Sequence, residues 1–109
     1  GGDEQDQCAL QLLLNVIEFG MNAVDAVSAP RFHTHHYLGS FRQKAPELGS
    51  LLLNARFDDA LSKEMQARGF KVKTPKGLLS APVLLRIDPQ TRVIEAAGDP
   101  RTRRHAAAY

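Results

Sequence analysis

The chain has 109 residues and a mass of 12.0 kDa, of which 43% of the residues are hydrophobic and 24% are charged. This length gives room for one hydrophobic core, and the composition excludes a multidomain enzyme, a fibrous repeat and a disordered tail. The longest segment without a charge, residues 7–17, is too short and too polar to span a bilayer, so we expect no membrane span. We also see no targeting leader, and the compartment stays open.

The net charge of +2 hides an asymmetry along the chain. Residues 1–30 hold five acidic and no basic residues, whereas residues 31–109 hold fourteen basic and seven acidic residues. The basic residues are scattered and lack interleaved aromatic residues, so we expect no nucleic-acid partner. The one tight cluster, Arg101, Arg103 and Arg104, is predicted to be a solvated terminal turn.

The first predicted element is a helix over residues 9–19. Its polar residues, Gln11, Asn15 and Glu18, fall on one narrow stripe, and every other face is apolar. We therefore expect this helix to be covered on most sides, as in a layered domain. It is predicted to end at Gly20.

A short second helix, a strand and a loop follow. Asn22 is predicted to cap the helix, which stops before Pro30. Residues 31–37 then change to a period of two, which predicts a strand. Residues 39–49 are predicted to form a loop, and residues 51–57 a second strand.

The C-terminal half predicts one further helix and an antiparallel end. Asp58 is predicted to cap the third helix, with Leu61 and Met65 on its buried face and Gly69 at its end. A half-exposed strand over residues 70–74 and a hairpin formed by residues 83–87 and 93–97 complete the list of elements. The sequence thus predicts one α/β (α+β) domain over residues 1–109, with helices on a largely antiparallel sheet.

The histidines and the single cysteine are the candidates for metal binding and for nucleophilic chemistry. Strand spacing places His33 and His35 on one face, within reach of one metal ion. No third ligand is evident and His36 points to the opposite face, so we expect sheet-surface histidines and no metal. Cys8 has only Asp6 and Gln7 beside it, which favours a small buried side chain over a nucleophile.

The chain carries no phosphate-binding loop, no Ser-x-x-Lys pair and no Gly-x-Ser-x-Gly elbow. We therefore expect neither a cofactor nor a nucleophile of these common types. Gly1 and Gly2 remain as a local oddity, because paired glycines let backbone N–H groups approach a ligand closely. Two terminal glycines can equally be a cloning remnant.

Several segments together carry a resemblance that covers nearly the whole chain. They are residues 15–22 (NVIEFGMN), Ala26, residues 29–33 (APRFH), Gly69, residues 98–101 (GDPR) and Tyr109. In order and spacing they resemble the C-terminal part of the small subunit of γ-glutamyltransferases, also called γ-glutamyltranspeptidases, which are N-terminal-nucleophile hydrolases. The resemblance implies a fragment of the αββα sandwich of those enzymes.

The resemblance also implies a role for the glycine pair. In that family the backbone N–H groups of such a pair form the oxyanion hole, and this role passes to Gly1 and Gly2. The family's nucleophile is a threonine that self-cleavage frees at the N-terminus of the small subunit, and this chain lacks it. The implied partners are the large subunit and the N-terminal part of the small subunit, and the implied substrate is a small γ-glutamyl compound such as a glutathione-like amide.

Departures from the family pattern keep alternatives open. Phe70 follows Gly69 where the family usually has histidine, and Arg103 and Arg104 replace a turn that contains glycine. These differences indicate a divergent branch, so the substrate can also be another acyl amide, as in related acylases. The rival from another class is a non-catalytic structural or interaction module with the same fold. Because the first helix is so apolar, we expect the isolated chain to self-associate, most simply as a homodimer.

Overall fold

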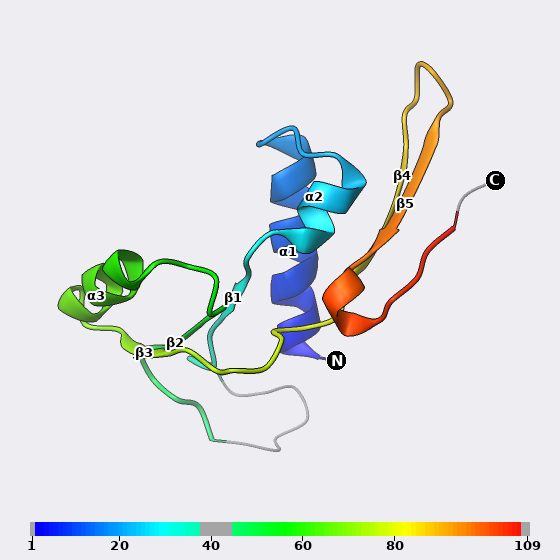
Figure 1. The fold of residues 1–109 in the computed structure, drawn as a ribbon. Helices are drawn as coiled ribbons and strands as arrows, with labels where there is room; N and C mark the ends of the chain where they lie inside the picture. The colour runs from blue at the N-terminus through cyan, green and yellow to red at the C-terminus, as the bar shows by residue number, and fades with distance from the viewer. Residues whose placement is uncertain (1, 38–44, 108–109) are drawn as a thin grey trace. The chain divides into compact units, whose positions relative to one another are not determined.

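The computed structural model describes residues 2–37 and 45–107 (Figure 1). These residues form two compact units, one built from residues 2–8, 30–37 and 45–79 and the other from residues 9–29 and 80–107. The first helix, α1 (Asp3–Ile17), contributes its first turns to the first unit and the rest to the second. Within the described residues, no helix is both long enough and apolar enough to cross a membrane.

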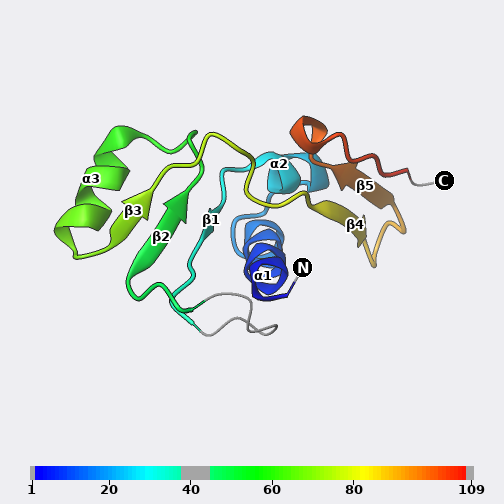
Figure 2. The ribbon, with the colours of Figure 1, turned by 90° about the horizontal axis from the view of Figure 1, so that it is seen from below.

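The first unit contains a three-stranded sheet in the order β1-β2-β3 (Figure 2). The strands are β1 (Phe32–His33), β2 (Ser50–Leu53) and β3 (Lys71–Lys73). β1 runs antiparallel to β2, with Phe32 opposite Leu53, and β3 runs parallel to β2, with Ser50 opposite Lys71. Parallel neighbours need a crossover connection, and the helix α3 (Asp59–Ala67) supplies it.

Local signals explain the limits of α3. The Asp58 carboxylate accepts the N–H of Leu61 at 2.8 Å, and Gly69 follows the helix with a φ of +96°. The predicted cap and end are therefore confirmed. The prediction that Leu61 and Met65 are buried is wrong, since both are only half-buried and α3 has no buried residue.

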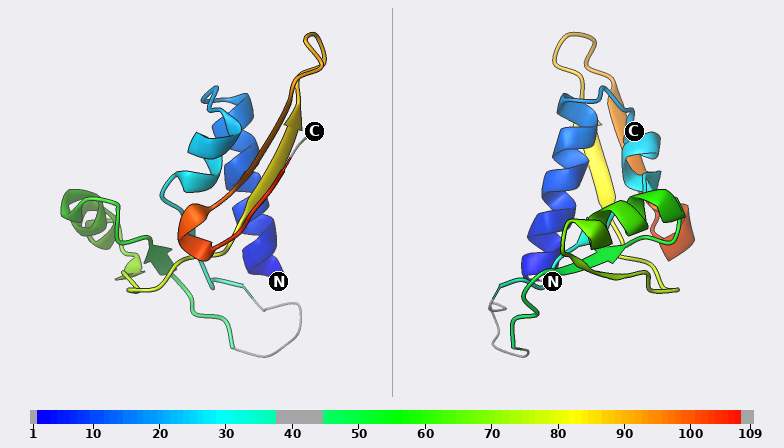
Figure 3. Two further views of the ribbon diagram at one scale, coloured as in Figure 1. Left: turned by 45° about the vertical axis from the view of Figure 1, so that its right-hand side comes forward. Right: turned by 90° about the vertical axis from the view of Figure 1, so that its left-hand side faces the viewer.

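The second unit contains the rest of α1, the helix α2 (Ala23–Ser28), a two-stranded hairpin and the short 3₁₀ helix η1 (Pro100–Thr102). The hairpin strands β4 (Val83–Ile87) and β5 (Ile94–Gly98) lie side by side (Figure 3), and α2 packs on them with three buried side chains. The Asn22 side chain caps α2 by accepting the N–H of Asp25 at 2.8 Å, and Gly20 follows α1 with a φ of +64°. These elements confirm the predicted helix pair and hairpin.

The predicted strand over residues 31–37 is longer than the β1 that forms. After His33, the backbone N–H groups bond to side chains instead of to a neighbouring strand. Thr34 N–H donates to Gln7 Oε1 and His35 N–H donates to Ser50 Oγ, both at 2.8 Å. The helix α1 in turn begins at Asp3, six residues earlier than predicted, because acidic residues suit the positive end of a helix dipole. The predicted loop over residues 39–49 lies mostly outside the described residues.

Two of the three strand pairings are antiparallel, as expected for this mixed α/β fold. The cover expected around the first helix is incomplete in this chain, where Leu10, Leu13 and Ile17 are exposed. The hairpin likewise leaves one apolar face of β4 exposed, namely Val83, Leu85 and Ile87. Both apolar faces are exposed in the part of the chain that the structure describes.

Candidate functional site: the turn at the start of α1

Gly2 directly precedes α1 and has a φ of +70°, a conformation that residues with a side chain rarely adopt. Its carbonyl oxygen accepts the N–H groups of Gln5 at 2.9 Å and Asp6 at 3.3 Å, so the turn is fixed to the helix. A glycine in this conformation lets backbone N–H groups approach an oxygen atom of a ligand closely. Gly1, the other predicted site residue, lies outside the described residues.

A side-chain amide fastens the first turns of α1 to the segment that follows β1. Gln7 Oε1 accepts the Thr34 N–H at 2.8 Å, and Gln7 Nε2 donates to the Thr34 carbonyl at 3.1 Å. The same nitrogen lies 2.5 Å from the Tyr37 hydroxyl and 3.3 Å from the Asp3 carbonyl. We call this set of contacts the Gln7 clamp. Sequence analysis missed it because its partners lie 27 and 30 residues away, where no local spacing signals them.

His35 lies next to the Gln7 clamp in the sequence, and Tyr37, which is part of the clamp, is also ionisable. His35 Nε2 is 2.9 Å from Glu4 Oε1, which adds a second link between α1 and this segment. Burial raises the pKa of the Tyr37 hydroxyl, and the negative charges of Asp3 and Glu4 raise it further. Tyr37 therefore stays neutral at physiological pH and keeps its hydroxyl proton.

His33 is the last residue of β1, so the predicted strand does not extend to His35, and His33 is not the surface residue that was expected. Its side chain is buried, and Nε2 has no hydrogen-bond partner among the described residues. Burial lowers the pKa of His33, Arg31 and His35 add smaller contributions in the same direction, and Glu4 opposes them. No group of three or more His, Cys, Asp or Glu residues in the described ranges has an arrangement that could hold a metal ion.

Two further expectations concern Cys8 and the C-terminal arginines. Cys8 is buried, which confirms it as a core residue. Arg103 and Arg104 are exposed, as expected for a solvated turn. For Arg101 this expectation is wrong, because its guanidinium makes two hydrogen bonds to the buried Asp99 carboxylate, at 3.0 and 3.1 Å.

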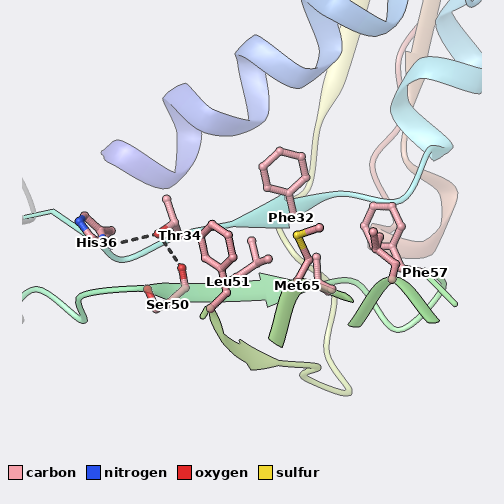
Figure 4. A pocket seen from close by; sticks show the side chains of 10 residues that line it. Phe32, Thr34, His36, Ser50, Leu51, Phe57 and Met65 are labelled. Carbon is pink, nitrogen blue, oxygen red and sulfur yellow. Dashed lines mark hydrogen bonds between the residues drawn. The ribbon is translucent and has the colours of Figure 1, made fainter. Parts of the chain in front are cut away.

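In the first unit, the three-stranded sheet and α3 form an apolar groove of about 690 Å³ (Figure 4). It is lined by residues of β1, β2 and α3 and of the segments next to them, namely Phe32, Thr34, His36, Ser50, Leu51, Leu53, Phe57, Leu61, Met65 and Phe70. Its polar groups satisfy one another, since Thr34 Oγ1 donates to the Ser50 carbonyl and accepts the His36 N–H. The groove therefore offers apolar contact and little polar recognition.

The fold places the chain among the mixed α/β proteins related to N-terminal-nucleophile hydrolases. The sequence profile of the gamma-glutamyltranspeptidase family matches residues 1–109, and the chain belongs to that family. A comparison with the curated proteins gives no match.

Solved structures agree with this family. LmbA2991HD is 31% identical with a TM-score of 0.82, and cephalosporin acylase from Bacillus halodurans is 26% identical with a TM-score of 0.79; the alignments cover 94% and 100% of this chain. An acivicin-inhibited gamma-glutamyltranspeptidase is 25% identical over 93% of this chain, with a TM-score of 0.71. The chain spans 19% of the first two proteins and 50% of the third, so it corresponds to a part of each.

Proposed function

We propose that this chain is the C-terminal portion of a γ-glutamyltransferase-like N-terminal-nucleophile enzyme, which transfers or hydrolyses the γ-glutamyl group of glutathione-like amides. Its contribution is part of the sheet and the oxyanion-hole turn at Gly1 and Gly2. The observation that carries this proposal is the left-handed Gly2 turn at the start of α1, held by the Gln7 clamp, in a chain that matches the family over residues 1–109.

The proposed reaction places the nucleophile on polypeptide outside these 109 residues. A threonine hydroxyl attacks the amide carbonyl while the threonine's own amine takes the hydroxyl proton. The carbonyl oxygen becomes negatively charged, and the backbone N–H groups of the glycine pair donate to it. The intermediate then collapses, and the amine product leaves with the proton that the threonine amine had taken. Water or an acceptor amine attacks the acyl-enzyme and gives a proton to the same amine; the ester bond then breaks, the acyl product leaves, and the proton returns to the threonine oxygen.

The matched gamma-glutamyltranspeptidase supports a catalytic role for this part of the enzyme. In that protein the C-terminus has critical roles in autoprocessing and catalysis. The remainder of the enzyme is the proposed partner of this chain, in line with the small fraction of each relative that it spans. The apolar faces of α1 and β4 are surfaces that such a partner would cover.

An acylase that acts on another acyl amide is the second candidate. The cephalosporin acylase match supports it, because that alignment covers the whole chain with a higher TM-score than the gamma-glutamyltranspeptidase alignment. Both candidates use the same oxyanion chemistry and differ in the acyl group. A non-catalytic module with this fold is the remaining rival.

The deciding experiment compares the full-length enzyme with the 109-residue chain, using a chromogenic γ-glutamyl anilide and a matched acyl anilide without the γ-glutamyl amino and carboxyl groups. We expect the full-length enzyme to release the chromophore from the γ-glutamyl substrate and the isolated chain to release none. Preference for the other anilide would favour the acylase. A full-length protein that is inactive on both would favour the non-catalytic module, and turnover by the pure 109-residue chain would contradict the external nucleophile.

A further inference from the structure

We propose that Gln7 is the positioning residue of the oxyanion hole: its side-chain amide sets the orientation of the Gly2 turn by holding α1 to the backbone of Thr34. This inference rests on the proposed function, which assigns the glycine pair to the oxyanion hole. Gln7 touches no reacting atom in this scheme. It acts through the helix that carries Gly2.

The clamp has the geometry of a strand pairing made by a side chain. The Gln7 amide uses its oxygen and its nitrogen on the N–H and the carbonyl of one residue, Thr34, at 2.8 and 3.1 Å. Two antiparallel bonds to one residue fix both the distance and the rotation of the amide. The contact at 2.5 Å between Nε2 and the Tyr37 hydroxyl gives the amide a third anchor.

Both ends of the clamp are attached to rigid backbone. On one end, Gly2 is tied to α1 by the N–H groups of Gln5 and Asp6, so the turn moves with the helix. On the other end, Thr34 Oγ1 donates to the Ser50 carbonyl of β2 at 2.8 Å. Hydrogen bonds thus connect the sheet to Gln7 through Thr34, and the backbone of α1 connects Gln7 to the glycine turn.

The neighbouring ion pair is a weaker candidate for this role. Glu4 is 53% exposed and His35 is 23% exposed, and exposed ion pairs contribute little because water and salt screen them. The Gln7 amide is half-buried, carries no charge and engages two backbone groups. It is therefore the contact that sets the position of the first turn.

Loss of the clamp should lower the rate and leave substrate binding unchanged. An oxyanion hole stabilises charge that develops only in the transition state, so misplaced donors reduce kcat while KM stays nearly constant. Small misplacements of such groups reduce rates by up to about 10²-fold. We expect this loss for Gln7→Met in the processed full-length enzyme, assayed with a γ-glutamyl anilide.

A second variant, Gln7→Glu, distinguishes the loss of the clamp from a general loss of folded structure. Gln7→Glu keeps an acceptor for the Thr34 N–H but replaces the donor to the Thr34 carbonyl with an oxygen. When the introduced carboxyl group is protonated, it regains a donor and matches glutamine in shape. The ionisable groups around it are Tyr37 and His35 on one side and Asp3, Glu4 and Asp6 on α1; the negative charges of the acids raise the pKa of the introduced carboxyl.

The expected signature is a pH profile. The kcat of Gln7→Glu relative to wild type should rise as pH falls, whereas that of Gln7→Met should stay low at every pH. Gln66→Glu is the matched control, because it adds the same charge at an exposed side chain of α3 that takes no part in the clamp or the glycine turn. We expect Gln66→Glu to keep the kcat of the wild type.

The outcomes separate this inference from the proposed function. Gln7→Met with kcat within about twofold of wild type, or a Gln7→Glu profile that runs parallel to that of Gln7→Met, overturns the positioning role. If Gln7→Met fails to mature, the Gln7→Glu profile decides alone. An inactive wild-type enzyme would instead overturn the proposed function and this role with it.

Discussion

Each of the two units holds a distant segment with one polar side chain, and the two clamps differ in charge and burial. In the first unit, the neutral Gln7 amide joins α1 to Thr34 and is half-buried. In the second unit, Arg101 joins Asp99 to the carbonyl of Ser28, 73 residues away, at 2.8 Å, and the Asp99 carboxylate is completely buried. A clamp of the first kind costs little stability when it is lost, whereas a buried charge without its partner costs much.

The difference separates positioning from stability. The Gln7 clamp holds the helix that carries the Gly2 turn, which we propose as part of the oxyanion hole. The Asp99–Arg101 pair lies at η1 and fixes the C-terminal segment to α2. Variants in the first region should therefore change rates, and variants in the second should change the free energy of unfolding.

The largest expected effect comes from Gly2→Val in the full-length enzyme. A β-branched side chain does not tolerate a φ of +70°, so the turn must rearrange and its N–H groups lose their alignment. Loss of one oxyanion donor lowers kcat by about 10² to 10³, or roughly 3 to 4 kcal/mol of transition-state stabilisation. The measurement is kcat of the processed enzyme with a γ-glutamyl anilide. A near-normal kcat would mean that the glycine turn has no catalytic role.

Next in size is Arg101→Ala, which leaves the Asp99 carboxylate buried without its guanidinium. Removing one partner of a buried pair costs about 3 to 5 kcal/mol, and because the Arg101 side chain is 29% exposed we expect about 2 to 3 kcal/mol. Urea denaturation at a fixed protein concentration measures the loss. Arg103→Ala, at an exposed residue of the same turn, is the control and should change stability by less than about 0.5 kcal/mol. Equal effects of the two variants would show that the buried pair does not hold this segment.

Gly98→Ala tests the packing of the C-terminal segment in the second unit without changing a charge. A Cβ atom at Gly98 would overlap the carbonyl oxygen of Arg104 and lie 2.6 Å from its carbonyl carbon, so the terminal segment must shift away from β5. Overpacking of this kind costs about 1 to 3 kcal/mol. Gly77→Ala is the matched control, because nothing lies within 4 Å of its Cβ position. If both variants unfold at the same urea concentration, the segment after β5 adds nothing to stability.

Sequence reasoning succeeded where the signal and its partner lie within a few residues. The caps Asn22 and Asp58 and the turn at Asp88, whose carboxylate accepts the N–H groups of Gln90 and Thr91, are local hydrogen-bond patterns. Element identities followed from such patterns, and the family followed from motifs spread along the chain.

The same reasoning failed where burial depends on partners far away in the sequence. From alternation alone His33 is predicted to be a surface residue, yet it is buried. Arg101 is predicted to be one of three surface arginines, yet it pairs with Asp99. The Gln7 clamp spans 27 residues, so nothing near Gln7 indicates it. The site role of Gly1 and Gly2 stays a prediction, and the sequence did not indicate the contacts that hold the turn.

The smallest expected effect concerns pH and returns to the first unit. Burial lowers the pKa of His33 below its ordinary value of 6.5, so the unfolded chain binds a proton more readily than the folded chain. The free energy of unfolding should therefore decrease as pH falls below about 6.5, until the pH has also passed the lowered pKa of the folded chain. One such group gives a slope of at most about 1.4 kcal/mol per pH unit.

The measurement is the urea midpoint of the wild type between pH 7.5 and pH 5.5, compared with that of His33→Gln. The variant cannot titrate at this position, so its midpoint should fall less over the same range. His105→Gln, at an exposed histidine, is the control and should keep the slope of the wild type. A wild-type slope in His33→Gln would mean that acid destabilises the chain through groups other than this buried ring.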